Sequence, residues 1–360
     1  MLPYIVLIFL PVIFQHISLN KRTITLSADK KKSETAMKCF WLILFILLAL
    51  RAETVGRDLP NYRYIYEYIA RNNWEKALAR SGEIGYTLLN KLISLFKDDF
   101  RWVLVASAIL SVYFTAKAYV KYSEDAVLTI ASYLNFSCFL LLFSGLRQSI
   151  AMSLGFVAFE FVRKKKIIPF LIIVAIALSF HTSAFMLLFM YPLYHIRVRR
   201  IYLVFIIPAL ALALVFNQQI FSVLGNILNS FTDYDTTINE TGAYTTLILF
   251  VFLAIFSFLI TDETTVDPDT VGLRSFLLFA VALQMFASLH SLAMRMNYYY
   301  IVFIPILLSR IIKCRSVYWS KVAKLARNVM VIYFILYFFI TAPKDNVLDT
   351  FPYKFFWQTN

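Results

Sequence analysis

Two polar side chains, Arg147 and Gln148, interrupt the apolar stretch LLLFSGLRQSIAMSLGFVAF at residues 140–159. An arginine at mid-bilayer costs about 3 kcal/mol or more, so this residue must face a polar partner rather than lipid. Its guanidinium is a planar fork of donors that suits a phosphate group. The stretch LSFHTSAFMLL adds His181, and a histidine serves near neutral pH as a general base or as a donor to phosphate. These residue types suggest phosphate binding combined with proton transfer.

The elements that position these side chains are membrane-spanning helices. Hydrophobic residues make up 60% of the 360 residues, the mean hydropathy is +0.70, and apolar runs of about 20 residues recur along the chain. We predict an all-α, polytopic integral membrane protein that forms a single domain over 1–360. The first apolar run lacks a basic start and a cleavage site, which favours a helix over a signal peptide. About twelve spans are expected, at 1–19, 37–52, 101–117, 125–143, 147–162, 167–182, 183–195, 201–217, 244–261, 275–291, 297–312 and 326–342.

The basic residues indicate how these spans are oriented. They give a formal net charge of +14, but they gather in short clusters between apolar runs, which is typical of topology signals and argues against nucleic-acid binding. Of the 35 Lys and Arg residues, 22 fall in alternate loops, which we place in the cytoplasm, with both termini outside. The three cysteines are scattered, without the spacing of a disulfide framework or a zinc site.

This topology places the unusual polar residues on one membrane face. Two long outer segments are expected: an amphipathic segment at 53–100, and a loop at 217–243 that contains no Lys or Arg. We therefore expect one site, open to the outer face and partly sunk in the bilayer. The residues at outer span ends or in outer loops are Asp58, Arg147, His181, Glu240, His290 and Arg295.

Arg147 has two interpretations. Ala151, Gly155 and Ala158 follow it at helical spacing, and such small residues let a neighbouring helix approach closely. Arg147 would then face the interior of the helix bundle. The alternative is an arginine that only sets topology or reaches back to the membrane surface. Such an arginine would lie on the basic side of the membrane, and Arg147 does not, so phosphate binding is favoured.

The stretch VGRDLPNYRYIYEYI (55–69) predicts an amphipathic helix at the outer interface. Tyr62 would lie on its apolar face, where it could contact substrate. Arg63, Glu67 and Arg71 would form supporting pairs on the polar face, because they are four residues apart.

Asp58 stands two residues before Pro60, as a helix N-cap does. Two interpretations remain open, an N-cap and a carboxylate of the site. Arg57 and Arg51 are further candidates for binding an anion.

Three other polar residues also have a structural and a functional interpretation. His181 could hydrogen-bond to a neighbouring helix, but the hydroxyl groups around it favour a site. Arg295 precedes the tyrosines at 298–300, which could form only an interfacial belt. Glu240 belongs to the outer loop, which could cover the site as a lid.

Convergent arginines imply a multiply charged anion, and a lipid diphosphate fits that requirement. Tyrosine-rich surfaces suit sugar rings, so Tyr62 is expected to contact substrate. Gln148, next to Arg147 in the sequence, is also expected to contact substrate. Arginines could supply the electrostatic stabilisation that a metal supplies elsewhere. We therefore expect no metal and no cofactor.

Five short stretches, in this order along the chain, resemble the EpsG-like Wzy family, whose members polymerise the repeat units of O-antigen, capsule and exopolysaccharide. The similarity spans roughly residues 50 to 300, and LRQSIA and FHTSA are its most specific parts. The stretches are VGRDLPNY, EIGYTLLNKL (83–92), SGLRQSIA, FHTSA and ETGAYTT.

The resemblance implies a GT-C-type glycosyltransferase in a bacterial inner membrane, acting at the periplasmic face. It would transfer a growing glycan from undecaprenyl diphosphate to a new lipid-linked repeat unit, as in lipopolysaccharide assembly, alongside a flippase and a chain-length regulator. Arg147 and Arg295 would bind diphosphate, and Asp58 and His181 would line the acceptor side. Arg57 departs from the family, which more often has a small hydroxyl residue there.

The mechanism we expect is a single inverting displacement, in which Asp58 or His181 takes the proton of the acceptor hydroxyl. Two other functions are alternatives. A flippase or another polysaccharide transporter would usually show two related halves, and the motifs here do not recur. A membrane acyltransferase would need a donor path from the cytoplasm, and no cytoplasmic histidine or acid cluster stands out.

Overall fold

The computed structural model describes residues 1–17, 26–79, 82–136, 138–228, 240–264, 266–315 and 317–358. Across these residues the regular elements are helices, joined by two isolated bridges that pair Arg51 with Phe355 and Thr261 with Arg315. The all-α prediction is therefore confirmed. The chain forms two compact units. Unit 1 comprises residues 1–188 and 325–360, and unit 2 comprises residues 189–324.

Five helices in the described ranges are long and apolar enough to cross a membrane, and two bent helix pairs bring the number to seven. They coincide with seven of the predicted spans and confirm a multi-pass membrane protein, while the total of twelve stays a prediction. The five are Lys30–Leu50, Arg101–Tyr122, Ala243–Ile260, Ser291–Lys313 and Ser320–Asp345. The bent pairs are Ala126–Asn135 with Cys138–Ser144, at 60°, and Arg200–Val215 with Asn217–Val223, at 76°.

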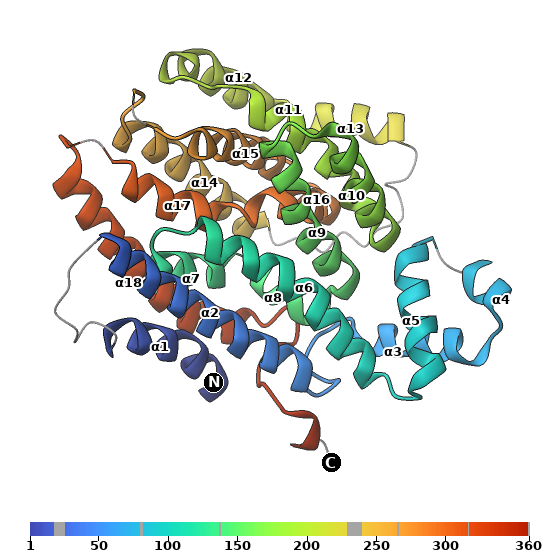
Figure 1. The fold of residues 1–360 in the computed structure, drawn as a ribbon. Coiled ribbons are helices and arrows are strands. Elements are labelled where there is room, and N and C mark those ends of the chain that lie inside the picture. Colours follow the sequence, from blue (N-terminus) through green and yellow to red (C-terminus); the bar gives the residue numbers. More distant parts are fainter. Residues whose placement is uncertain are drawn as a thin grey trace. The chain divides into compact units, whose positions relative to one another are not determined.

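Unit 1 contains the N-terminal helices and most of α18 (Figure 1). The predicted span at 183–195 instead forms a 3-10 helix, η2 (Thr182–Phe189), and the short α11. The other helices of this unit are α1 (Leu2–Ile17), α2 (Leu26–Leu50), α3 (Leu59–Arg71), α4 (Trp74–Ala79), α5 (Ile84–Phe96), α6 (Arg101–Tyr122), α7 (Ala126–Asn135), α8 (Cys138–Ser144), α9 (Leu146–Arg163), α10 (Ile167–Phe180), α18 (Ser320–Asp345) and η4 (Phe356–Gln358).

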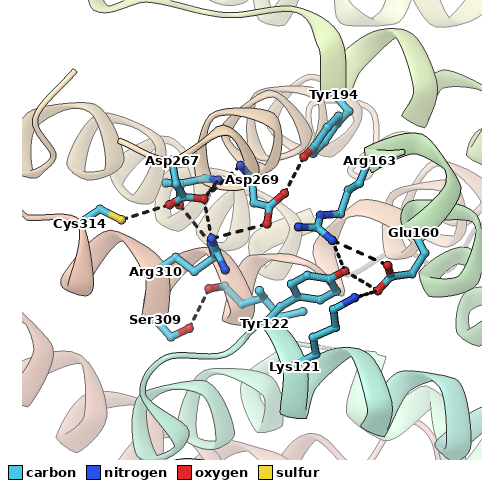
Figure 2. Close-up of polar contacts among 12 residues, drawn as sticks. Lys121, Tyr122, Glu160, Arg163, Tyr194, Asp267, Asp269, Ser309, Arg310 and Cys314 are labelled. Carbon is cyan, nitrogen blue, oxygen red and sulfur yellow. Dashed lines mark hydrogen bonds and ion pairs between the residues drawn. The ribbon is translucent and has the colours of Figure 1, made fainter. Parts of the chain in front are cut away.

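The two ends of unit 1 carry different polar contacts. At one end, the Tyr4 hydroxyl donates to the Thr350 carbonyl, and the Tyr353 hydroxyl donates to the carbonyl of Leu47, near the end of α2. At the other end, Arg327 pairs with Asp125 at 2.7 Å. Lys121, Tyr122 and Arg163 surround Glu160 there as well (Figure 2). Residues that the charge pattern assigned to opposite membrane faces thus lie at opposite ends of these helices.

Unit 2 contains a second set of ion pairs (Figure 2). Arg310 of α17 contacts Asp267 at 2.5 Å and Asp269 at 3.6 Å, and the Tyr194 hydroxyl donates to Asp269. Asp267 also caps the start of α15. These contacts join three elements of the unit. Its helices are α11 (Met190–His195), η3 (Arg200–Tyr202), α12 (Leu203–Val215), α13 (Asn217–Leu228), α14 (Glu240–Ile260), α15 (Pro268–Gln284), α16 (Ser291–Ile301) and α17 (Ile304–Lys313).

Helices α3, α4 and α5 pack together in the segment that was predicted to be amphipathic (Figure 1). Tyr62, Tyr66 and Ile69 are buried on one face of α3, while Arg63 pairs with Glu67 at 3.0 Å on the exposed face. The predicted amphipathic helix is therefore confirmed.

Lys91 of α5 connects α5 to the C-terminal end of α3 through hydrogen bonds. Its buried Nζ donates to the carbonyls of Ile69 at 3.1 Å and Asn72 at 2.6 Å. A cation near the last carbonyls of a helix also opposes the negative end of the helix dipole. This contact accounts for the lysine of the EIGYTLLNKL stretch.

We expect Lys91→Met to lower the free energy of unfolding by about 2 to 3 kcal/mol, because charge-assisted hydrogen bonds to buried carbonyls are lost. Thermal unfolding of the purified protein in detergent measures the loss, and proteolysis should increase near residues 72–79. The control is Lys76→Met, since Lys76 is exposed in α4. Equal unfolding temperatures for the two variants would contradict this role.

Candidate functional site

Glu83 lies at the centre of a polar cluster in unit 1. One carboxylate oxygen, Oε2, contacts Nη1 of Arg147 at 2.5 Å. The other, Oε1, lies 2.5 Å from Nδ1 of His181 and 3.4 Å from the backbone nitrogen of Thr182. The cluster thus joins two residues predicted to form a site with a carboxylate that the prediction did not include.

Three helix ends position these side chains. Glu83 precedes α5, Arg147 lies in the first turn of α9, and His181 follows α10 in an extended conformation. A Cβ on Gly85 would collide with Ser179, so only glycine lets the start of α5 approach the end of α10 this closely. That approach brings Glu83 to His181.

Arg147 is held by aromatic residues as well as by charge. Its guanidinium carbon lies 5.3 Å from the centre of the Tyr62 ring and 6.0 Å from that of Tyr86, within the range of cation–π contacts. Its side chain is 30% exposed, whereas that of Glu83 is 8% exposed. Arg147 can therefore reach a ligand while Glu83 holds it in place.

A pocket of about 190 Å³ opens beside this pair. Its walls include Glu83, Arg147, Tyr86, Thr87 and Asn61, and the rest come mainly from α3. Roughly six water molecules would fill this volume. The pocket is therefore large enough for a diphosphate or part of one sugar, but not for an oligosaccharide.

The contact with Glu83 determines which ring nitrogen of His181 carries the proton. An ionised carboxylate only accepts hydrogen bonds, so Nδ1 of the imidazole carries the proton and donates it. Nε2 is then the basic nitrogen. Carboxylate–histidine pairs of this kind orient the imidazole in hydrolases.

The environment of Glu83 favours the ionised carboxylate. Burial alone would raise the pKa of Glu83, but the His181 hydrogen bond and the Arg147 charge outweigh it, so the pKa lies below the ordinary value of 4.5. A lowered pKa contributes stability above the unfolded-state pKa, and this stability is lost as the pH falls through the folded-state value.

We therefore expect the thermal stability of the protein to fall on acidification below about pH 4.5, as the carboxyl takes up a proton. Glu83→Gln should start from a lower unfolding temperature at pH 7 and lose less on acidification, because it has no proton to gain there. Unfolding temperatures in detergent across this pH range test the prediction. Parallel curves for the two proteins would contradict it.

Asp58 occupies the N-cap position of α3, but its side chain does not cap the helix. Of the two interpretations of Asp58, side-chain capping is therefore wrong, although the residue does stand at the N-cap. The Ser144 hydroxyl donates to the Asp58 carboxylate at 2.9 Å, and the Ser144 oxygen accepts from the Asp58 backbone N–H at 3.1 Å. The Asp58 carboxylate thus bonds to Ser144, at the end of α8, instead of to the first backbone N–H groups of α3. Gly56 permits this approach, since its φ is +131° and a Cβ there would collide with Phe143.

Other predicted residues of unit 1 lie near this region. Gln148 follows Arg147 in α9 and is buried. The Arg57 side chain is exposed. Arg51 is 1% exposed and its guanidinium lies 5.6 Å from the centre of the Phe143 ring.

Two predicted site residues belong to unit 2. Arg295 is exposed in α16. Glu240 begins α14, and its side chain lies outside the described residues, as do residues 229–239. The predicted loop at 217–243 begins with a helix, α13. His290 caps α16, because its Nδ1 accepts from the Leu292 backbone N–H at 3.0 Å.

The helices and their apolar spans define the class of this chain, a multi-pass helical membrane protein. The EpsG family model matches residues 35–355, and the chain belongs to the EpsG family. It is therefore a membrane protein of polysaccharide biosynthesis. No curated protein and no solved structure shows significant similarity to it. The resemblance drawn from the sequence motifs is confirmed, and the matched residues include Glu83, Arg147 and His181.

Proposed function

We propose that the protein polymerises undecaprenyl-diphosphate-linked oligosaccharide repeat units, transferring the growing glycan to a new lipid-linked repeat. The observation that supports this most is the cluster of Arg147, Glu83 and His181. It combines a partly exposed cation with an oriented base at one end of unit 1. Transfer from a diphosphate requires both functions, since negative charge develops on the leaving group and the acceptor hydroxyl loses a proton.

The reaction we propose is a single displacement with inversion. The acceptor hydroxyl attacks the anomeric carbon, and the bond from that carbon to the diphosphate oxygen breaks. Nε2 of His181 takes the hydroxyl proton, while Glu83 stabilises the imidazolium that forms. Arg147 binds the departing lipid diphosphate. Holding two membrane-bound substrates in register would supply a further part of the acceleration.

Asp58 has a different role in this proposal. The sequence left Asp58 and His181 as alternative bases, and the contact of Asp58 with Ser144 favours His181. Asp58 would position the start of α3, and thereby the Tyr62 ring against Arg147. Arg295 and Glu240 of unit 2 keep their predicted substrate-binding roles as proposals.

The proposed setting is the bacterial inner membrane, with this end of unit 1 facing the periplasm. Partners would be the lipid-linked oligosaccharides themselves, membrane lipid, a flippase that delivers repeat units and a regulator of chain length. The charge pattern supports this orientation, because the Lys121 and Arg327 end of the unit carries the predicted cytoplasmic residues.

A strain that lacks the encoding gene tests the proposal. Surface glycan from that strain should run on a gel as lipid core with a single repeat unit, and expression of the intact chain should restore the ladder. The matched control is the same strain carrying an empty vector. Loss of all glycan, including the single repeat, would instead indicate a flippase or an earlier step.

A further inference from the structure

A long apolar groove runs between α2 and α6 in unit 1, and it is separate from the site described above. It encloses about 620 Å³ and contains part of two candidate membrane spans, Lys30–Leu50 and Arg101–Tyr122. Large apolar side chains line most of it, and three of them, Leu42, Ile109 and Tyr113, are exposed on the surface of the protein. The apolar lining residues are Trp41, Leu42, Phe45, Ile109, Val112 and Tyr113.

The dimensions of the groove suit a chain-like ligand. On α6 the lining extends from Ile109 to Lys121, which at 1.5 Å per residue corresponds to about 18 Å along the helix. A hydrocarbon chain follows such a path, whereas a small soluble molecule would fill only a part of it. Because the groove lies on two candidate spans, its exposed apolar surface would meet lipid rather than water.

One end of the groove is basic. Lys38, Lys117 and Lys121 line this end, together with a single acid, Glu34. Lys121 is paired with Glu160 at 2.7 Å (Figure 2). Glu160 lies at the opposite end of α9 from Arg147, the partner of Glu83.

An anion near Lys38 and Lys117 would reduce the repulsion between like charges at this end of the groove, in addition to what Glu160 does for Lys121. Lys117 and Lys121 are four residues apart on one helix, and like charges at that spacing destabilise a helix. Lys38 faces them from α2, and the basic run at 30–32 precedes it on the same helix. Basic residues beside the end of a span are typical of sites for anionic lipids.

We infer that this groove binds an anionic glycerophospholipid of the surrounding bilayer, with its phosphate between Lys38 and Lys117 and an acyl chain along Trp41 and Tyr113. The apolar part accepts the chain of any phospholipid, and the lysines select the headgroup. Zwitterionic lipids gain less, because their ammonium group is repelled by the same lysines. The inference is independent of the proposed glycosyl transfer.

Native mass spectrometry of the purified full-length protein tests this assignment. Phosphatidylglycerol and phosphatidylcholine with identical acyl chains are titrated separately. Each lysine near an anionic headgroup contributes roughly fivefold in affinity, so we expect phosphatidylglycerol to bind at least about tenfold more tightly. It should also raise the unfolding temperature more than phosphatidylcholine does.

In the double variant Lys38→Gln/Lys117→Gln, the ratio of the affinities for phosphatidylglycerol and phosphatidylcholine should fall to about 1. The protein should stay folded, because both side chains are exposed. The matched control is Lys164→Gln/Lys166→Gln, two exposed lysines between α9 and α10 that should leave the preference intact. Ile109→Trp should weaken binding of both lipids by filling the groove.

Three outcomes would overturn the inference. Equal affinity for the two lipids would remove the headgroup selection, and an unchanged preference in the Lys38/Lys117 variant would place the anion elsewhere. Displacement of phosphatidylglycerol by soluble glycerol phosphate, or by polyprenyl phosphate at lower concentration, would assign the groove to a small anion or to a polyprenyl lipid.

Discussion

Arg147→Ala should reduce glycan polymerisation by about 100-fold or more, so that the surface glycan collapses from a ladder to the single-repeat form. Removing one preorganised donor to developing charge typically costs this much. Arg147 is suited to the role because its guanidinium is held by the Glu83 carboxylate and by the Tyr62 ring, yet remains partly exposed. Gel analysis in the deletion strain measures the ladder, and membrane abundance of the variant is measured alongside.

A conservative variant separates charge from geometry. Arg147→Lys keeps the positive charge but loses the planar fork, so we expect shortened ladders rather than none. The matched control is Arg163→Ala, which removes another ion-paired arginine from the opposite end of the same helix. A normal ladder in Arg147→Ala, at normal abundance, would show that the leaving diphosphate is bound by other residues.

His181→Ala should lower the turnover rate by roughly 100- to 10,000-fold, the range that a positioned general base contributes. Substrate binding should change much less, because in the proposed mechanism His181 acts on the acceptor proton. His181→Gln is a sharper test, since glutamine keeps hydrogen bonding but cannot take up a proton at neutral pH. The measurement is the rate of chain extension by purified protein on lipid-linked repeat units.

Glu83→Gln should have an intermediate effect on the rate. A neutral amide no longer stabilises the imidazolium, so the rate of chain extension should fall, but by less than in His181→Ala. The control for both variants is His195→Ala, at the end of α11 in unit 2. A His181→Gln protein that extends glycans at the wild-type rate would exclude this base.

Hydropathy and charge predicted the helical class, because a stretch long enough to cross a bilayer is visible in the sequence without any tertiary contact. The predicted face of α3 was also correct, with Tyr62, Tyr66 and Ile69 buried. The bend between α7 and α8 and the 3-10 helix η2 were not predicted. Apolar length does not reveal where the backbone of a span breaks.

The site was predicted in part. Arg147, His181 and Tyr62 do come together, but Glu83, which joins the first two, was missed. It belonged to an amphipathic segment in which acids and bases balance, and it stands 64 and 98 residues from its partners. The sequence did offer one signal for Glu83. The stretch EIGYTLLNKL, which the resemblance had already singled out, begins with Glu83 and contains Gly85. Side-chain capping, one of the two interpretations of Asp58, is wrong for the same reason, since its partner Ser144 is 86 residues away.

The backbone hydrogen bonds of the loop before α3 have a consequence for the order of events during synthesis. Ala52, Gly56 and Arg57 donate to the carbonyls of Lys354, Asp349 and Leu348, which follow about 290 to 300 residues later. When α3 emerges from the ribosome, the segment at 348–354 that fixes its approach has not been made. The loop carrying Asp58 can take its final form only after α18 has been inserted. A nascent chain stalled before residue 348 would therefore lack the hydrogen-bond partners of this loop, and the approach of Asp58 and α3 would be fixed only after residues 348–354 have been made.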